Sequence, residues 1–134
     1  AQETIAQLTT DINFQFVSNP FVKFNAKWDI EPNYDFIRFQ AFIADSGWIT
    51  LSGEYTEAGS GQPAQPFGEH GYDDLQEDWV EETIYLDYLG GFEIEGFRFI
   101  QTSDNFVEGD GFSIDNLQIL GYNTSPHCKL LKKV

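Results

Sequence analysis

The sequence predicts an all-β protein, an antiparallel sandwich of two sheets, and three observations support this class. Apolar residues recur at every second position in short runs rich in Phe, Ile, Val and Tyr. Gly, Pro, Asn and Asp separate these runs from one another. Roughly seven runs follow each other with no helix between them, which favours two packed antiparallel sheets over a parallel α/β sheet.

The first half of the chain contains the longest alternating runs. Ile5 and Leu8 indicate a short helix within residues 1–10, and strands are expected at three places after it: residues 12–16, 21–28 and 34–44. In the last of these, Arg38 and Gln40 would lie on one face, and the opposite face would carry Ile37, Phe39, Ala41 and Ile43. The turn at residues 45–47 (Asp-Ser-Gly) predicts a hairpin to a further strand at residues 48–55.

The second half begins with a long break in the pattern. Residues 56–78 hold four Gly and two Pro, and Leu75 is almost their only aliphatic residue. A loop of this length in a small domain usually has a function or covers another surface. Strands are expected again at residues 80–87, 92–101 and 112–120. Within residues 92–101, Phe97 and Phe99 would share one face, and the other would carry Ile94, Arg98 and Ile100. We assign four aromatic residues to the core: Phe14, Phe39, Phe97 and Phe99.

The length of 134 residues suits a single domain. We expect an N-terminal segment at residues 1–13, the sandwich at residues 14–120, and a C-terminal tail, linker or terminal strand at residues 121–134, which Pro126 interrupts. No apolar run approaches the ~20 residues of a membrane helix. No signal peptide is visible, and the missing initiating Met favours a fragment of a larger protein. The single cysteine, Cys128, cannot form an internal disulfide and says little about the compartment.

The chain is strongly acidic, with 22 Asp and Glu against 7 Lys and Arg and a formal net charge of -15. This surface would repel nucleic-acid phosphates and anionic membranes, so neither is expected as a partner. Residues 54–115 carry 16 of the acids and a single base, Arg98. Such a block usually forms a solvated face, and the alternative is that some of its carboxylates converge on a cation.

Motifs for nucleophilic, metal-hydrolytic and nucleotide chemistry are missing. Neither His70 nor His127 has the surroundings of a catalytic triad, and Cys128 beside His127 has no local signature. The sequence lacks a G-x-S-x-G elbow and an H-E-x-x-H motif, and the Gly109-Asp110-Gly111 stretch precedes a strand instead of a helix. The chain itself is therefore not expected to be an enzyme. A glycosidase that uses two carboxylates is the least favoured alternative.

Two acidic stretches, residues 28–35 and 103–115, combine carboxylates with turn residues, as calcium sites do when they collect ~6–8 oxygen ligands. The second is not an EF-hand, because Phe106 occupies its third ligand position. An ordinary acidic loop explains each stretch as well. Asp115 interrupts the apolar alternation, which suggests a β-bulge or an inward-facing carboxylate. A buried carboxylate needs a partner, which could be Arg98 or a cation.

The same stretches carry a family resemblance. Trp28-x-x-Glu31-x-x-Tyr34-Asp35-Phe36, the Asp45-Ser46-Gly47-Trp48 turn, Trp79, residues 84–90, Phe97-Arg98-Phe99, Ser103-Asp104 and residues 109–117 follow one another in the order of a known pattern. The region from Phe14 to Leu120 thereby resembles the jelly-roll module of MAM-type and immune-inhibitor-A-type domains, with a galactose-binding-like sandwich. It is also similar to the accessory β-domain of secreted bacterial zinc carboxypeptidases. Ser46 departs from the pattern, which has a Gly there, and the loop before Trp79 is unusually acidic.

The resemblance implies a non-catalytic accessory module, secreted or at the cell surface, whose partner is an adjacent catalytic domain in the same chain. It also implies a structural calcium ion. The candidate ligands that it indicates are Glu31, Asp35, Asp104 and Asp115, with Asp110 as a further candidate.

Aromatic residues offer a second functional hypothesis, a carbohydrate-binding module. Side chains near the long loop could form a platform that stacks on a polysaccharide or a peptide, and the candidates are Trp48, Tyr55, Tyr72 and Trp79. The alternative is that they belong to the core, because a Trp in a small β-domain is more often buried than exposed.

Overall fold

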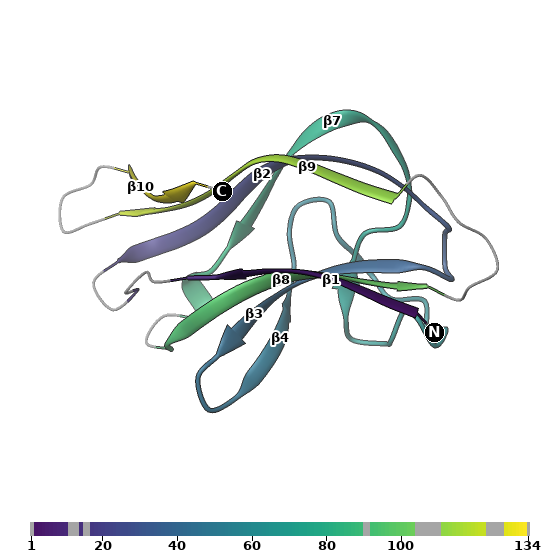
Figure 1. Cartoon of the computed structure of the whole chain (residues 1–134), viewed down its shortest axis with the longest axis horizontal. Helices are drawn as coiled ribbons and strands as arrows, with labels where there is room; N and C mark the ends of the chain where they lie inside the picture. Colours follow the sequence, from purple (N-terminus) through teal and green to yellow (C-terminus); the bar gives the residue numbers. More distant parts are fainter. Residues whose placement is uncertain are drawn as a thin grey trace.

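The computed structural model describes residues 2–10, 14, 17–89, 92–103, 111–122 and 128–133. Within these residues, two four-stranded antiparallel sheets pack against each other, which confirms the predicted sandwich (Figure 1). The first sheet has the order β1 (Gln2–Thr9), β8 (Ile94–Ser103), β3 (Phe36–Ile43), β4 (Gly47–Leu51). The second has the order β10 (Cys128–Lys133), β9 (Gly111–Tyr122), β2 (Ser18–Ile30), β7 (Asp74–Tyr85).

The pairing of distant strands defines the topology. Strand β2 pairs with β9 in one sheet, and β3 pairs with β8 in the other, so the second pairing is nested within the first along the chain, as in a jelly roll. A small ribbon of β5 (Glu57–Ala58) and β6 (His70–Gly71) and a short 3-10 helix, η2 (Asp87–Leu89), complete the described elements. No helix among the described residues has the length and apolarity needed to cross a bilayer.

The N-terminal segment differs from the sequence-based expectation, and the C-terminal tail contains the terminal strand that was one of its expected forms. Residues 2–9 form strand β1 and not a helix, and every residue of β1 pairs with β8. An isolated helix of ten residues is marginal in water, whereas β1 satisfies its backbone groups at an open sheet edge. In the tail, residues 128–133 form β10 beside β9, so the sandwich extends beyond residues 14–120 at both ends. The strand expected at residues 12–16 lies largely outside the described residues, and Phe14 packs against the core.

The core lies between the inner faces of the two sheets. In β3 the inner face carries the four apolar residues that the alternation predicted, while Arg38 and Gln40 lie on the outer face. Phe39 stacks on Phe97 with ring centroids 5.5 Å apart, and both are buried as expected. Phe99 is only partly buried and packs against the same cluster. These contacts between β3 and β8 join residues far apart in the sequence into one aromatic layer.

Two irregularities in register redirect side chains. Between Phe42 and Ile43 the pairing with β8 shifts, so Ile94 enters the core opposite Ile43 and does not share the outer face with Arg98 as expected. In β9, the register with β2 shifts just after Asp115, where Asn116 adopts a left-handed φ of 55°. The bulge that the sequence suggested at Asp115 is therefore present. The alternative, an inward-facing carboxylate, is wrong, because Asp115 is exposed.

The long connection between β4 and β7 is held by the buried side chain of Gln65. Its amide donates to the Asp35 carbonyl at 2.6 Å and to the Asp73 carboxylate at 2.8 Å, and it accepts from the Ser60 amide at 3.1 Å. The connection also covers part of the first sheet, because Gly71 lies so close to Phe36 that a Cβ would meet its ring at 2.8 Å. The sequence predicted a covering loop here, but β7 already begins at Asp74.

A fully buried carboxylate, Glu82 of β7, fixes the start of the same connection. One of its oxygens accepts from the amides of Glu54 (2.8 Å) and Thr83 (2.9 Å). The other accepts from the amide of Tyr55 (3.0 Å) and the hydroxyl of Tyr72 (2.8 Å). Burial raises the pKa of the Tyr72 phenol well above its usual value, and the charge of Glu82 and the hydrogen bond raise it further, so the phenol stays protonated and donates. Four donors compensate the desolvation of this carboxylate.

We predict that Glu82→Gln lowers the free energy of unfolding by about 2–3 kcal/mol, because the new amide group would place donors against donors in a buried site. Chemical denaturation followed by tryptophan fluorescence measures this loss.

The matched control is Glu81→Gln, one residue away on the exposed side of β7. The Glu81 carboxylate faces Lys23 at 3.8 Å with an exposed side chain, so its loss should cost less than about 0.5 kcal/mol. Equal stability of the two variants would contradict the structural role assigned to Glu82.

Candidate binding groove

A three-residue bulge in β7 lies at a groove on the outer face of the second sheet. The pairing of β2 with β7 runs regularly to Ala26 opposite Val80, and it resumes at Trp28 opposite Gln76. Residues 77–79 of β7 therefore stand opposite the single residue Lys27. Three residues against one force β7 to bow away from its neighbour, as the arch of β7 in Figure 1 shows.

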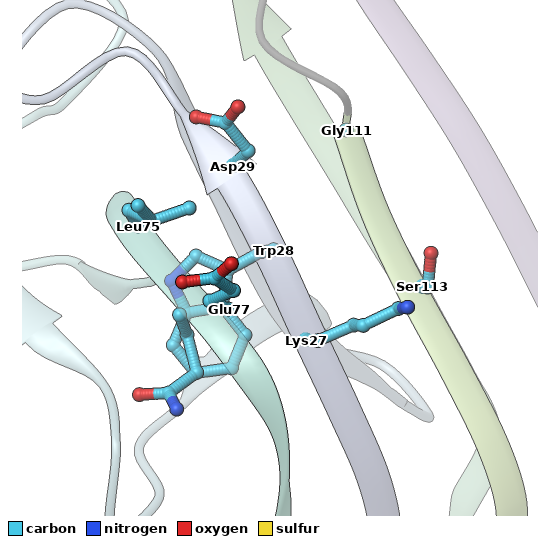
Figure 2. Close-up of a pocket in the computed structure, with 8 residues that line it drawn as sticks. Lys27, Trp28, Asp29, Leu75, Glu77, Gly111 and Ser113 are labelled. Atoms are coloured by element: carbon cyan, nitrogen blue, oxygen red, sulfur yellow. The ribbon is translucent and has the colours of Figure 1, made fainter.

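The groove has a volume of about 530 Å³ and crosses three strands. Figure 2 shows Lys27 and Asp29 on β2, Leu75 and Glu77 on β7, and Gly111 and Ser113 on β9. Trp28 and Gln76 complete the lining. The groove thus combines an indole and an aliphatic side chain with carboxylate, amide, hydroxyl and ammonium groups.

Trp28 is held in place at the groove by contacts on several sides. Its indole nitrogen donates to the Asp73 carbonyl at 2.9 Å. Its ring stacks on Phe112 with centroids 5.5 Å apart and contacts Tyr72 at 5.0 Å. Trp28 is only 7% exposed, so it lines the groove as a fixed apolar wall and not as a movable surface residue.

Trp79 lies in the bulge beside the groove and is 49% exposed. The Lys27 ammonium lies over its ring, 5.0 Å from the centroid, which is cation–π distance. Leu75, near the start of the same strand, is 60% exposed. An exposed indole that a neighbouring cation holds in position is a suitable surface for stacking.

The four residues predicted to form an aromatic platform do not lie together. Trp79 is exposed at the groove, and Trp48 lies on β4 of the opposite sheet. Tyr55 is 37% exposed and contacts Trp28, with ring centroids 6.4 Å apart. Tyr72 is buried and bonds to Glu82, so it supports the wall of the groove from inside and offers no surface to a ligand.

The predicted calcium ligands are only partly placed by the structure. Glu31 and Asp35 lie in one turn, where the Asp35 amide donates to the Glu31 carbonyl at 3.1 Å, and Asp35 is buried. Asp104 and Asp110 lie outside the described residues. No three His, Cys, Asp or Glu side chains of the described residues form a metal-binding group.

Asp115 does not join that turn. It pairs with Asn25, whereas Glu31 follows the end of the same strand six residues later. Six residues of extended chain span about 20 Å, so Asp115 and Glu31 cannot share one ion. An ion pair of Asp115 with Arg98 is also excluded, because Arg98 lies on the outer face of the other sheet.

None of the residues that line the groove was predicted from the sequence to bind a saccharide, and only Trp79 beside it was. Lys27 did lie in the alternating run predicted at residues 21–28, but polar residues on the outer face are the rule in sandwiches. The bulge at residues 77–79 depends on pairing between distant strands, which a single sequence does not reveal. Glu82 left one signal: it occupies the inward-facing position between Val80 and Ile84.

Comparisons with known proteins add no family to these observations. No protein-family model matches the sequence, and no curated protein matches it either.

The calcium site therefore stays a prediction, with Glu31 and Asp35 as its candidate ligands. If the ion binds there, millimolar Ca²⁺ should raise the melting temperature relative to chelator. A free Ca²⁺ concentration of ~100 times the Kd stabilises the native state by about 2.7 kcal/mol. Asp35→Asn should abolish the increase, and Asp115→Asn should retain it.

An equal concentration of Mg²⁺ serves as the control for general screening of the net charge of -15. The same melting temperature in Ca²⁺, Mg²⁺ and chelator would argue against the site.

Proposed function

We propose that this chain is a non-catalytic binding module that holds a neutral saccharide in the groove across β2, β7 and β9. The observation that carries the proposal is the exposed indole of Trp79 beside a groove lined with hydrogen-bonding side chains. Binding sites of this kind combine an apolar surface with a few polar groups that fix the orientation of the ligand.

The chemistry of the lining suits a polyhydroxylated ligand. Carboxylates such as Asp29 and Glu77 accept hydrogen bonds from sugar hydroxyls, while the Gln76 amide and the Ser113 hydroxyl both donate and accept. The Trp79 indole offers a flat apolar surface for the C–H face of a sugar ring. Trp28 adds a rigid wall, so binding requires little ordering of the protein.

Charge favours a neutral ligand in this groove over an anionic one. Its lining contains two carboxylates, Asp29 and Glu77, and one ammonium, Lys27, which already lies over Trp79. The formal net charge of the chain is -15, so no long-range attraction draws an anion to this groove either.

The setting of the module is a further part of the proposal and rests on the sequence resemblance alone. Modules of that type accompany a catalytic domain of secreted bacterial enzymes, among them zinc carboxypeptidases. A saccharide-binding module in that position would hold the neighbouring catalytic domain near a polysaccharide surface.

We predict that Trp79→Ala weakens binding of a soluble neutral polysaccharide about tenfold, which corresponds to about 1.4 kcal/mol of lost stacking. Affinity electrophoresis through gels that contain galactomannan, xyloglucan or dextran identifies the polysaccharide that retards the wild type. Isothermal titration with an oligosaccharide of that polymer then gives the affinities.

Tyr85→Ala is the matched control, because Tyr85 is another exposed aromatic residue of β7, six residues from Trp79. It should bind like the wild type. The proposal fails if none of these polymers retards the wild type, or if both variants bind as the wild type does.

A further inference from the structure

The two arginines of the sequence lie together on the outer face of the first sheet, opposite to the sheet that carries the groove. Arg98 of β8 pairs with Gln40 of β3, and Arg38 of β3 pairs with Ile100 of β8. The two arginines are therefore diagonal neighbours, about 7–8 Å apart at the backbone. Burial lowers the pKa of Arg98, the charge of Arg38 lowers it further, and the charge of Glu3 on the neighbouring strand β1 raises it.

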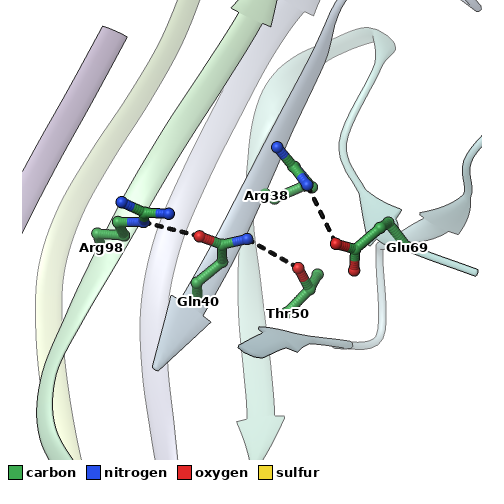
Figure 3. Close-up of polar contacts among 5 residues, drawn as sticks. All are labelled: Arg38, Gln40, Thr50, Glu69 and Arg98. Carbon is green, nitrogen blue, oxygen red and sulfur yellow. Dashed lines mark hydrogen bonds and ion pairs between the residues drawn. The ribbon is translucent and has the colours of Figure 1, made fainter. Parts of the chain in front are cut away.

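The Arg98 side chain is held from two directions. Its guanidinium carbon lies over the Trp48 ring, 4.2 Å from the centroid. Its Nε donates to the Gln40 side-chain carbonyl at 2.7 Å, and the Gln40 amide donates onward to the Thr50 hydroxyl at 2.9 Å (Figure 3). Gln40 is buried, so this chain of hydrogen bonds is a fixed support.

The anchoring of Arg98 leaves its terminal nitrogens available. Stacking uses the flat face of the guanidinium and the Gln40 bond uses Nε, so the terminal N–H groups are not needed by either contact. Within the described part of the chain, Arg98 forms no ion pair, although carboxylates outnumber basic side chains threefold. A guanidinium fork held in this way is preorganised for a planar carboxylate.

Arg38 adds a second kind of group to the same face. Its Nη1 donates to Oε1 of Glu69 at 3.1 Å, and the Glu69 side chain is 33% exposed (Figure 3). The Arg38 Nε is buried, and no atom of the described residues accepts from it. Glu69 is thereby fixed beside Arg38, and its second oxygen can accept a hydrogen bond from a ligand hydroxyl.

We propose that the outer face formed by Arg38, Arg98, Trp48 and Glu69 binds the carboxylate of an acidic sugar, a uronate. The sugar carboxylate pairs with the Arg98 fork, and a ring hydroxyl donates to Glu69. A glutamate-rich peptide fits this face less well, because its side chains have no hydroxyl to donate to Glu69. The proposal does not depend on the groove, which lies on the other sheet and takes a neutral ligand.

The test is isothermal titration of the folded chain with trigalacturonate at about 0.15 M salt, where the screening length is about 8 Å. The fully methyl-esterified trimer is the matched ligand, since it keeps the hydroxyls and lacks the charge. We expect the ester to bind at least tenfold more weakly. A short poly-glutamate peptide is the third ligand and should bind more weakly than the uronate.

Arg98→Lys keeps the positive charge but removes the fork, so it should weaken trigalacturonate binding about tenfold. It should leave the binding of the neutral polysaccharide unchanged. The Nε–H signals of the two arginines in a two-dimensional ¹⁵N spectrum of the wild type give a second measurement that does not depend on a variant. The Arg98 signal should shift on addition of the acid and stay in place with the ester.

Equal affinities for acid and ester, or an Arg98 signal that does not move with the acid, would overturn the proposal. So would poly-glutamate binding as tightly as the uronate, which would assign the face to an acidic peptide instead. Loss of neutral polysaccharide binding in Trp79→Ala alone would leave this proposal unaffected, because that result concerns the other sheet.

Discussion

The buried carboxylate of Glu82 is the constraint on which the arrangement of this molecule depends. A fully buried charge is tolerated only when donors surround it, and here the donors come from the turn after β4, from β7 and from Tyr72. Tyr72 in turn packs against Trp28, the fixed wall of the groove. The hydrogen bonds that the buried Glu82 carboxylate requires hold the long connection against the sandwich. Through Tyr72 and Trp28, they also help to position one wall of the groove on the outer face of the second sheet.

The outer faces of the two sheets use one device for different chemistry. On each face a cation lies over an indole: Lys27 over Trp79 on the second sheet, and Arg98 over Trp48 on the first. Neither of these two cations forms an ion pair with a carboxylate among the residues that the structure describes. In a chain with a net charge of -15, each pair gives a positive charge an attractive partner other than a carboxylate. The neighbouring groups make the two surfaces chemically different. Carboxylates lie around the pair of Lys27 and Trp79, and a second arginine lies beside the pair of Arg98 and Trp48.

Alternation of apolar residues was sufficient to predict the sandwich and the two faces of β3, because both follow from the period of an extended chain. It could not predict that residues 2–9 form a strand, since that depends on the free edge of β8, almost a hundred residues away. The groove was hidden for the same reason: the bulge beside Trp79 is a property of pairing and not of local sequence. In the sequence, Glu82 differs from the exposed acids only in its position between two residues that face inward.

The groove is the central claim, and a ¹⁵N NMR titration of the wild type tests it most directly. A neutral oligosaccharide taken from the polymer that retards the protein should shift the backbone amides of residues 27–29 and 75–79 and the indole N–H signals of Trp28 and Trp79. Amides of β3 and β8 on the opposite sheet should stay in place. Shifts confined to that opposite sheet, or none at millimolar ligand, would contradict the account.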